Sequence, residues 1–312
     1  MALAGLFHDL GHGPFSHVFD TVVLPKFATG LDGITHEKRS QWIVEQIFKE
    51  VQPDGFSAYD IDLIKNIIEP PGNMIDEDSH GIKRYVGVEK PYLYEIINNE
   101  LNSIDVDKLD YLQRDAKHIG LDYTFGPARI LNKSFVSPDT NSIVYDSTVE
   151  NNIFEMYYTR YKFHKDIYNH KTVKLIELML GDALISSNDV YNFASAINTE
   201  DYLKLDDSIY SRILYSSKSS LAESKRILQN IESRDLYKCH YYGPVGSYKS
   251  APTSVANYRQ VKVHFSLCSG HKDPLHNVLI HTRGMGTLRY GKLNNRLVPD
   301  KFEEYIVMYY TK

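Results

Sequence analysis

The sequence predicts a mainly α-helical protein that ends in a small α+β lobe. Through the first two thirds of the chain, apolar residues recur at helical spacing between short polar breaks. Near Tyr241 glycine and proline become frequent, and beyond them polar and apolar residues alternate at the spacing of strands. We therefore expect a helical domain over residues 1–240 and a small α+β lobe over residues 241–312.

The expected helices follow from capping residues and breakers. Thr35 can cap a helix that runs to Val51, and Ser57 with Asp60 resembles a capping box before a helix over Ile61–Ile68. Other helices are expected over residues 92–101, 105–118, 149–186 and 221–232.

The C-terminal part predicts strands before a last helix. Residues Gln260–Leu267 alternate polar with apolar, which is typical of a strand with one buried face. Short strands are also expected over residues 278–280 and 287–290, and a loop is expected after Tyr241. Pro299 would then open an amphipathic helix that runs through Tyr309.

Composition excludes several classes of protein. A net charge of −5 argues against general affinity for nucleic acid or anionic membranes. The only two cysteines, Cys239 and Cys268, argue against a disulfide framework or a cysteine-bound zinc. No apolar stretch approaches the roughly 20 residues that span a membrane, and no secretory signal precedes the helices. We expect a protein of the nucleus or cytoplasm that is not secreted.

A histidine-rich run near the start is the strongest functional signal. His8 and Asp9 are adjacent, and the backbone can turn after them because Gly11 follows. Imidazole and carboxylate groups that converge at such a turn can bind one divalent cation. The donors admit manganese, iron, zinc or magnesium without choosing among them. The alternative is a helix C-terminus at which one histidine caps carbonyls, but that reading explains a single histidine.

The run HDLGHGPFSH resembles the metal-binding motif of HD-domain phosphohydrolases, and its flanks resemble the SAM- and HD-domain deoxynucleoside triphosphate triphosphohydrolases. Residues 139–150 and 241–259 match that family poorly. Further similar blocks occur in the family's order, at Thr35–Glu37, Leu93–Ile97, Ile104–Tyr111, Tyr158–Arg160, Tyr168–Lys171 and Ile231–Leu236. The resemblance implies an HD-domain helical core that hydrolyses dNTPs, dGTP among them, to a deoxynucleoside and inorganic triphosphate.

The resemblance also assigns roles at the reaction centre. It implies that the metal is held by His8, Asp9 and Asp107. It implies a proton-transfer and orienting set of His12, His17, Asp20, His36 and Glu37, in which His17 also faces substrate. Within this set we favour His12 as the proton donor to the leaving oxygen and His36 as a residue that tunes it. His17 and His36 could equally be hydrogen-bonded structural residues.

Two helical arcs would line the substrate. Asp107, Lys108, Tyr111 and Asp115 lie within about 100° of one another on a helix, although such a polar arc can also be a solvated face. The resemblance places Lys108 on a phosphate, and Tyr111 and Asp115 on the sugar. A second arc, which could be only a basic solvated stripe, consists of Arg160, His164, Tyr168 and Lys171.

For this second arc, the resemblance implies that Arg160 contacts the outer phosphates, where a guanidinium matches the oxygens. It implies that His164 lies at the substrate and that Tyr168 packs against C2′ of the sugar. A tyrosine ring at that position would exclude a ribonucleotide by steric overlap.

A regulatory nucleotide site between subunits is also implied. Its candidate residues are Arg129, Asn152, His170, Lys171, Arg234 and Lys238. The basic pair that the family has before Val149 aligns here with Asp146 and Thr148. Acid in place of base would repel triphosphate. We therefore expect nucleotide-driven tetramerisation to be weakened or lost, while some self-association as a homo-oligomer persists.

The chain departs from the family at its start. The family takes a further metal-binding histidine from an upstream helix, whereas this chain begins seven residues before His8. The resemblance therefore implies a chain without the SAM domain and the N-terminal part of the HD domain. One alternative is a non-catalytic nucleotide-binding or regulatory paralogue. Another is an HD phosphohydrolase that acts on nucleotide monophosphates or cyclic dinucleotides, but it would not need the sugar-facing residues.

Overall fold

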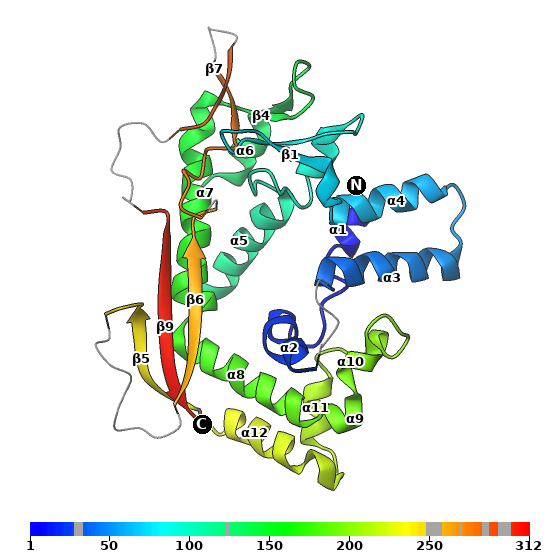
Figure 1. The fold of residues 1–312 in the computed structure, drawn as a ribbon, viewed down its shortest axis with the longest axis vertical. Coiled ribbons are helices and arrows are strands. Elements are labelled where there is room, and N and C mark those ends of the chain that lie inside the picture. The colour runs from blue at the N-terminus through cyan, green and yellow to red at the C-terminus, as the bar shows by residue number, and fades with distance from the viewer. Residues whose placement is uncertain (28–33, 123–124, 248–257, 269, 283–286, 293–300) are drawn as a thin grey trace. The chain divides into compact units, whose positions relative to one another are not determined.

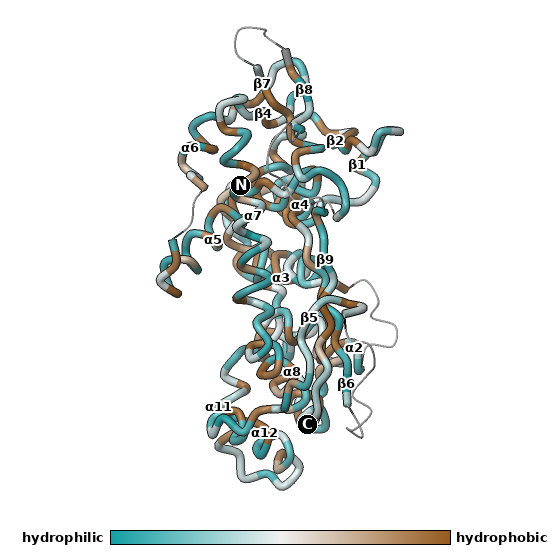
Figure 2. The backbone as a smooth tube through the Cα atoms, turned by 90° about the vertical axis from the view of Figure 1, so that its left-hand side faces the viewer, coloured by the Kyte–Doolittle hydropathy of each residue, from teal (hydrophilic) through white to brown (hydrophobic). Residues whose placement is uncertain are grey.

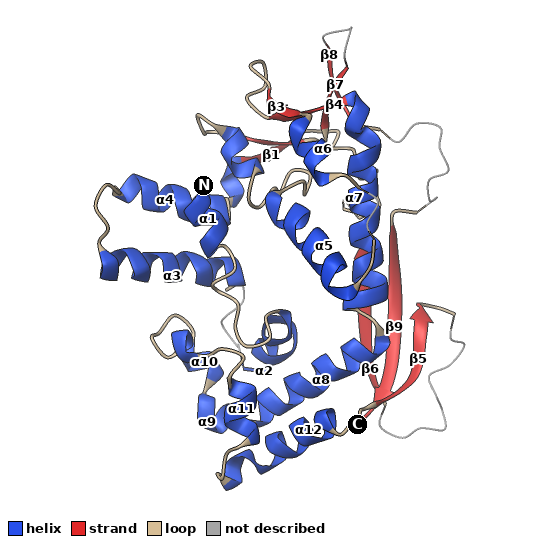
Figure 3. Ribbon diagram, turned by 180° about the vertical axis from the view of Figure 1, so that it is seen from behind, coloured by secondary structure: helices blue, strands red, loops and turns tan. Residues whose placement is uncertain are grey.

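The computed structural model describes the chain except for residues 28–33, 123–124, 248–257, 269, 283–286 and 293–300. The described part is mainly helical and contains small sheets, as Figures 1 and 3 show, which confirms the expected fold class. Its residues form two compact units. Unit 1 comprises Met1–Gly5, Asp62–Ile167 and His264–Tyr305, and unit 2 comprises Leu6–Ile61, Tyr168–Val263 and Ile306–Lys312. The expected boundary at residue 240 stays a prediction.

Unit 1 combines helices with a mixed sheet. The four-stranded sheet has the order β3-β4-β7-β8, in which β4 and β7 are parallel and the outer pairs are antiparallel. A separate hairpin pairs β1 with β2. The elements are α4 (Ala58–Ile68, which starts in unit 2), β1 (Ile75–Glu77), β2 (Lys83–Tyr85), α5 (Val106–Ile119), α6 (Pro127–Asn132), β3 (Ser134–Val136), β4 (Ile143–Asp146), α7 (Glu150–Phe163), β7 (Leu279–Thr282) and β8 (Thr287–Tyr290).

Helices of unit 2 pack around a large apolar core. Phe19, Ile43, Met179, Phe193 and Ile227 are all buried in this core. The unit contains η1 (a π-helix, Phe19–Val23), α2 (Leu24–Phe27), α3 (His36–Val51), α8 (Lys171–Ser186), α9 (Asn188–Tyr191), α10 (Phe193–Ala196), α11 (Ile209–Leu214) and α12 (Ala222–Glu232).

Two further features complete the description of the fold. α1 (Ala2–Phe7) begins in unit 1 and ends in unit 2. A three-stranded sheet has the order β5-β9-β6 and consists of β5 (Lys238–Pro244), β6 (Arg259–Ser266) and β9 (Glu303–Thr311). None of the described helices has the length and hydrophobicity of a membrane-spanning segment, and Figure 2 shows hydrophilic residues recurring along the described chain.

Local capping signals were reliable predictors of helices. The side chain of Thr35 accepts a hydrogen bond from the Lys38 amide at the start of α3, and Ser57 exchanges hydrogen bonds with Asp60 at the start of α4. Asp105 caps α5 in the same way. The predictions of α3, α4 and α5 are therefore confirmed. The predicted helix α12 and the predicted strands β6, β7 and β8 are also present.

The predicted helix over residues 92–101 is wrong. Only a short 3-10 helix, Pro91–Glu95, is present, and irregular turns follow it. The buried Asn99 side chain accepts a hydrogen bond from the Leu101 amide and donates to the Ile104 carbonyl. An asparagine that bonds the neighbouring backbone in this way competes with helical hydrogen bonds.

The predicted continuous helix over residues 149–186 is also wrong. It divides into α7, a π-helical turn over His164–Tyr168, and α8. The break falls at Asn169 and His170, where the His170 side chain caps α8 by accepting from the Thr172 amide. Gly181 lies within α8 and does not interrupt it. A Cβ at this position would lie 2.3 Å from the Val22 side chain, so glycine permits the close packing of α8 against η1.

The remaining corrections concern strands. Glu303–Thr311 form strand β9 where a helix through Tyr309 was expected, because this run is rich in β-branched and aromatic residues and pairs with β5. Pro299 lies outside the described residues. The loop expected after Tyr241 begins later, since β5 continues to Pro244. The first two thirds of the chain also contain β1 to β4, which helical spacing did not predict.

Candidate functional site

The His8–Asp9 pair lies just after α1, where the helix ends at Phe7. His8 Nε2 and Asp9 Oδ2 are 3.3 Å apart. Two ligands that each lie about 2.1 Å from one ion, at octahedral or tetrahedral angles, are about 3.0–3.4 Å apart. The adjacent imidazole and carboxylate therefore have the donor chemistry and the spacing that a first-row divalent cation requires.

The turn after this pair packs tightly against α3. The Ser40 hydroxyl donates to the His8 carbonyl at 2.6 Å and accepts from the Gly11 amide at 2.8 Å. A Cβ on Gly11 would lie 2.0 Å from the His36 carbonyl oxygen, so only glycine fits there. The glycine expected to free the backbone thus allows a close approach of the turn to α3.

Three of the predicted histidines gather in unit 2. The rings of His12 and His36 stack, with centroids 4.0 Å apart and planes 12° apart. The His17 ring meets the His12 ring edge-on at 5.0 Å. Asp20 Oδ2 lies 3.3 Å from His12 Nδ1 and 3.9 Å from His36 Nδ1, and Glu37 Oε1 lies 3.2 Å from His36 Nε2. The predicted proton-transfer set is therefore brought together.

Burial and neighbouring charges shift the pKa values of Asp20 and His36 in this cluster. Burial alone would raise the pKa of Asp20, but contact with His12 and the charge and hydrogen bond of Arg39 outweigh it and hold the pKa below its usual value. Burial and the neighbouring His12 ring lower the pKa of His36. Asp20 is therefore favoured as an anion and His36 as a neutral imidazole.

Asp9, His12 and His36 also offer ligand atoms within 4.8 Å of one another. The geometry of the two rings argues against one ion between them. An ion bound by an imidazole nitrogen lies close to the ring plane, and two stacked, nearly parallel planes do not share such a position. His8 and Asp9 are therefore the better metal ligands in unit 2.

The arc on α5 is present, in unit 1. Lys108 Nζ lies 2.7 Å from Asp105 Oδ2, which is buried at the start of the helix. Tyr111 is close enough to Arg160 to share a hydrogen bond, and burial raises the pKa of Tyr111 to about 12, so the phenol stays protonated. Asp107 and Asp115 lie on the same helix. The metal role of Asp107 stays a prediction.

The second arc differs from the expectation. Arg160 ends α7 and donates to the Ser266 carbonyl at 3.4 Å, whereas His164 opens the π-helical turn. Tyr168 ends that turn and belongs to unit 2, as does Lys171. The four residues therefore do not form one continuous helical face, and the substrate roles of His164 and Tyr168 stay predictions.

The predicted regulatory residues are divided between the units. Arg129 and Asn152 belong to unit 1, whereas His170, Lys171, Arg234 and Lys238 belong to unit 2. Arg129 donates to the Thr148 carbonyl at 3.2 Å. Asp146 accepts from the amide and the hydroxyl of Thr148, which gives this acid a capping role. The regulatory site stays a prediction.

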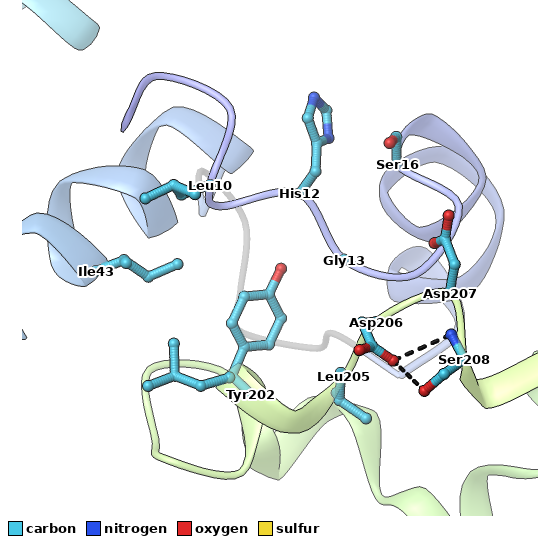
Figure 4. Close-up of a pocket in the computed structure, with 11 residues that line it drawn as sticks. Leu10, His12, Gly13, Ser16, Ile43, Tyr202, Leu205, Asp206, Asp207 and Ser208 are labelled. Carbon is cyan, nitrogen blue, oxygen red and sulfur yellow. Dashed lines mark hydrogen bonds between the residues drawn. The ribbon is translucent and has the colours of Figure 1, made fainter. Parts of the chain in front are cut away.

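A pocket of about 570 Å³ adjoins His12 in unit 2. Figure 4 shows His12, Gly13 and Ser16 on one side of it and Tyr202 and Leu205 on the other. The Tyr202 hydroxyl points toward the turn and donates to the Gly11 carbonyl at 2.7 Å.

The sequence prediction missed Arg39, Ser40 and Tyr202. One signal was available for Arg39, because it lies four residues before Ile43 on the apolar face of the expected helix. A charged residue on a buried face needs a buried partner. Tyr202 gave no such signal, because its contact with Gly11 joins residues far apart in sequence.

The histidine–aspartate pair and the helical fold together define an HD-type site. No family model matches the chain. It is 38% identical to the putative HD domain-containing protein L394 of Acanthamoeba polyphaga mimivirus, over 76% of this chain and 51% of that protein.

The chain is also similar to deoxynucleoside triphosphate triphosphohydrolases named SAMHD1. Identity is 32% to the proteins of both Danio rerio and Homo sapiens, over 99% of this chain and 57% of each. The chain spans about half the length of the curated relatives it matches. These similarities confirm the resemblance to the SAM- and HD-domain deoxynucleoside triphosphate triphosphohydrolases.

Proposed function

We propose that this chain is a metal-dependent dNTP triphosphohydrolase that acts on dGTP among other dNTPs and releases deoxynucleoside and inorganic triphosphate. The observation that supports it most is the His8–Asp9 pair, spaced for one cation, in the same unit as the stacked His12 and His36 rings. Similarity to relatives with that named activity, over 99% of this chain, supports it independently.

His8, Asp9 and Asp107 would hold the metal, which is manganese, iron, zinc or magnesium. When bound, such an ion acidifies water and neutralises phosphate oxygens. The remaining steps belong to the protein. His12 donates a proton to the 5′ oxygen as its bond to the α-phosphorus breaks, because imidazole exchanges protons near neutral pH.

Asp20 orients and charges His12, since its carboxylate lies 3.3 Å from Nδ1 and would stabilise an imidazolium. His36 stacks on His12 and remains neutral, so it does not oppose that charge. Glu37 fixes the His36 ring through Nε2. His17 contacts the edge of His12 and faces substrate.

Substrate recognition would use the residues of the two predicted arcs. Lys108 and Arg160 bind phosphate oxygens, and Arg160 offers a bidentate guanidinium. Tyr111 and Asp115 contact the sugar, and His164 lies at the substrate. Tyr168 packs against C2′ and excludes a ribonucleotide, which predicts a preference for dGTP over GTP.

A regulatory nucleotide would bind between copies of the chain, at the six residues named for it above. Asp146 and Thr148 replace a basic pair there, so we expect nucleotide-driven tetramerisation to be weakened or lost. Self-association remains part of the proposal, as does a location in the nucleus or cytoplasm.

The test is product analysis with dGTP and manganese. The wild-type chain should release deoxyguanosine and triphosphate in equal amounts. His12→Gln should lower kcat by about 10²–10⁴-fold, whereas the matched change His118→Gln, at an exposed position on α5, should leave it unchanged. Metal-loaded protein that binds dGTP without turnover would instead support a regulatory paralogue.

A further inference from the structure

Among the described residues of unit 2, Arg39 is the largest side chain that is completely buried. It lies on α3, three residues after His36, and its side chain has no exposed surface. A buried guanidinium is costly unless its charge and its donors are satisfied. Its surroundings must therefore supply both an anion and several acceptors.

The guanidinium reaches three acceptors with three different nitrogens. Nε donates to the Gly11 carbonyl at 2.7 Å, and Nη1 donates to the Ile34 carbonyl at 2.8 Å. Nη2 forms a short ion pair with Asp20 Oδ1. Arg39 thereby joins the turn after His8, the start of α3 and the carboxylate of η1.

Asp20 uses its two oxygens differently. Oδ1 pairs with Arg39, whereas Oδ2 faces His12 at 3.3 Å and His36 at 3.9 Å. An arginine that holds one oxygen fixes the direction of the other, because the carboxylate is planar and rigid. Arg39 thus controls where the negative charge beside His12 lies.

The Gly11 carbonyl, which accepts from Arg39, also accepts from a second donor. This donor is the Tyr202 hydroxyl at 2.7 Å, and the Arg39 guanidinium lies 5.6 Å from the centroid of the Tyr202 ring. Two donors on one carbonyl fix the peptide that precedes His12. The backbone and the carboxylate that orient His12 therefore both depend on Arg39.

We propose that Arg39 is a positioning residue for the reaction, which acts on His12 through Asp20 and through the Gly11 carbonyl. This inference rests on the proposed function. Arg39 is buried and does not touch substrate, so its loss should lower kcat and leave KM nearly unchanged. Partners that orient active-site ligands typically account for 10–100-fold in activity.

The experiment compares Arg39→Met, Asp20→Asn and the double variant with wild type, in kcat for dGTP per folded molecule and in Tm. Arg39→Met should lower kcat by about 10–100-fold. In the Asp20→Asn background the same change should cost less than about threefold, because the residue through which Arg39 acts is already altered. If the kcat loss of the double variant equals the product of the losses of the two single variants, the inference is overturned.

Stability gives a second readout that does not depend on activity. Arg39→Met should lower Tm by about 10 °C, because Asp20 loses its buried counter-charge. Adding Asp20→Asn should recover at least half of that loss, and a double variant no more stable than Arg39→Met would contradict the inference. If wild type shows no hydrolysis, the proposed function fails, and this comparison still decides whether Arg39 fixes Asp20.

Two further variants separate geometry from charge. Arg39→Lys keeps the charge, but one ammonium nitrogen cannot occupy three donor positions, so kcat should stay at least fivefold below wild type. Full recovery by lysine would show that charge alone matters and would overturn the positioning role. The matched control is Arg226→Met on α12, where an exposed arginine pairs with Glu223 and its loss should change neither kcat nor Tm appreciably.

Discussion

The buried carboxyl of Glu95 predicts a pH-dependent stability that one substitution should remove. Glu95 is 2% exposed, and one of its oxygens accepts from the Ile143 amide at 3.2 Å. Burial raises its pKa from 4.5 to about 7. The folded chain therefore retains a proton that the unfolded chain has already lost.

The direction and size of this pH dependence follow from the linkage between proton binding and folding. Between pH 4.5 and 7 the folded state binds more protons than the unfolded state, so the free energy of unfolding falls as pH rises. A shift of about 2.5 pKa units at about 1.36 kcal/mol each corresponds to about 3 kcal/mol. That contribution is fully present below pH 4.5 and is lost above pH 7.

Glu95→Gln should abolish this contribution, because the amide is neutral and has nearly the same shape. Urea unfolding at pH 4.5, 6, 7 and 8 should show the variant gaining about 3 kcal/mol on wild type across that range. The matched change Glu50→Gln, at an exposed position of α3, should leave the wild-type pH profile unchanged. Parallel profiles for wild type and Glu95→Gln would refute the reasoning.

Three further outcomes are expected. Gly11→Ala should abolish activity and lower stability by at least about 2 kcal/mol, because its Cβ would lie 2.0 Å from the His36 carbonyl oxygen; an active, stable variant in urea unfolding would contradict this. Tyr157→Phe should cost about 1 kcal/mol, because the buried hydroxyl donates to the Asn102 carbonyl, and an unchanged unfolding midpoint would count against it. Chelation should abolish dGTP turnover, and added manganese should restore it; turnover that persists in metal-free protein would exclude the proposed metal role.

Sequence predicted best the elements that are fixed locally. Thr35 and Asp105 cap α3 and α5 through hydrogen bonds to amides three residues away, so a short window contained the whole signal. The segment over residues 92–101 failed because Asn99 bonds the backbone and the sequence does not show which partner wins. β9 failed because its pairing with β5 joins segments about 65 residues apart.

In the candidate site, too, the features set by neighbouring residues were predictable, and those set by residues far apart in sequence were not. His8 and Asp9 are neighbours in sequence, and a motif alone predicted their convergence. Arg39 was missed because its three acceptors come from separate segments, and only folding brings them around one guanidinium. The spacing on α5 was predictable, whereas the break before α8 was not.

Hydrolysis of dGTP in ¹⁸O-labelled water with manganese tests the central claim most directly. Attack of water on the α-phosphorus predicts unlabelled deoxyguanosine and a triphosphate that contains one ¹⁸O atom. Label in the nucleoside, release of dGMP with pyrophosphate, or no product from metal-loaded protein would contradict it.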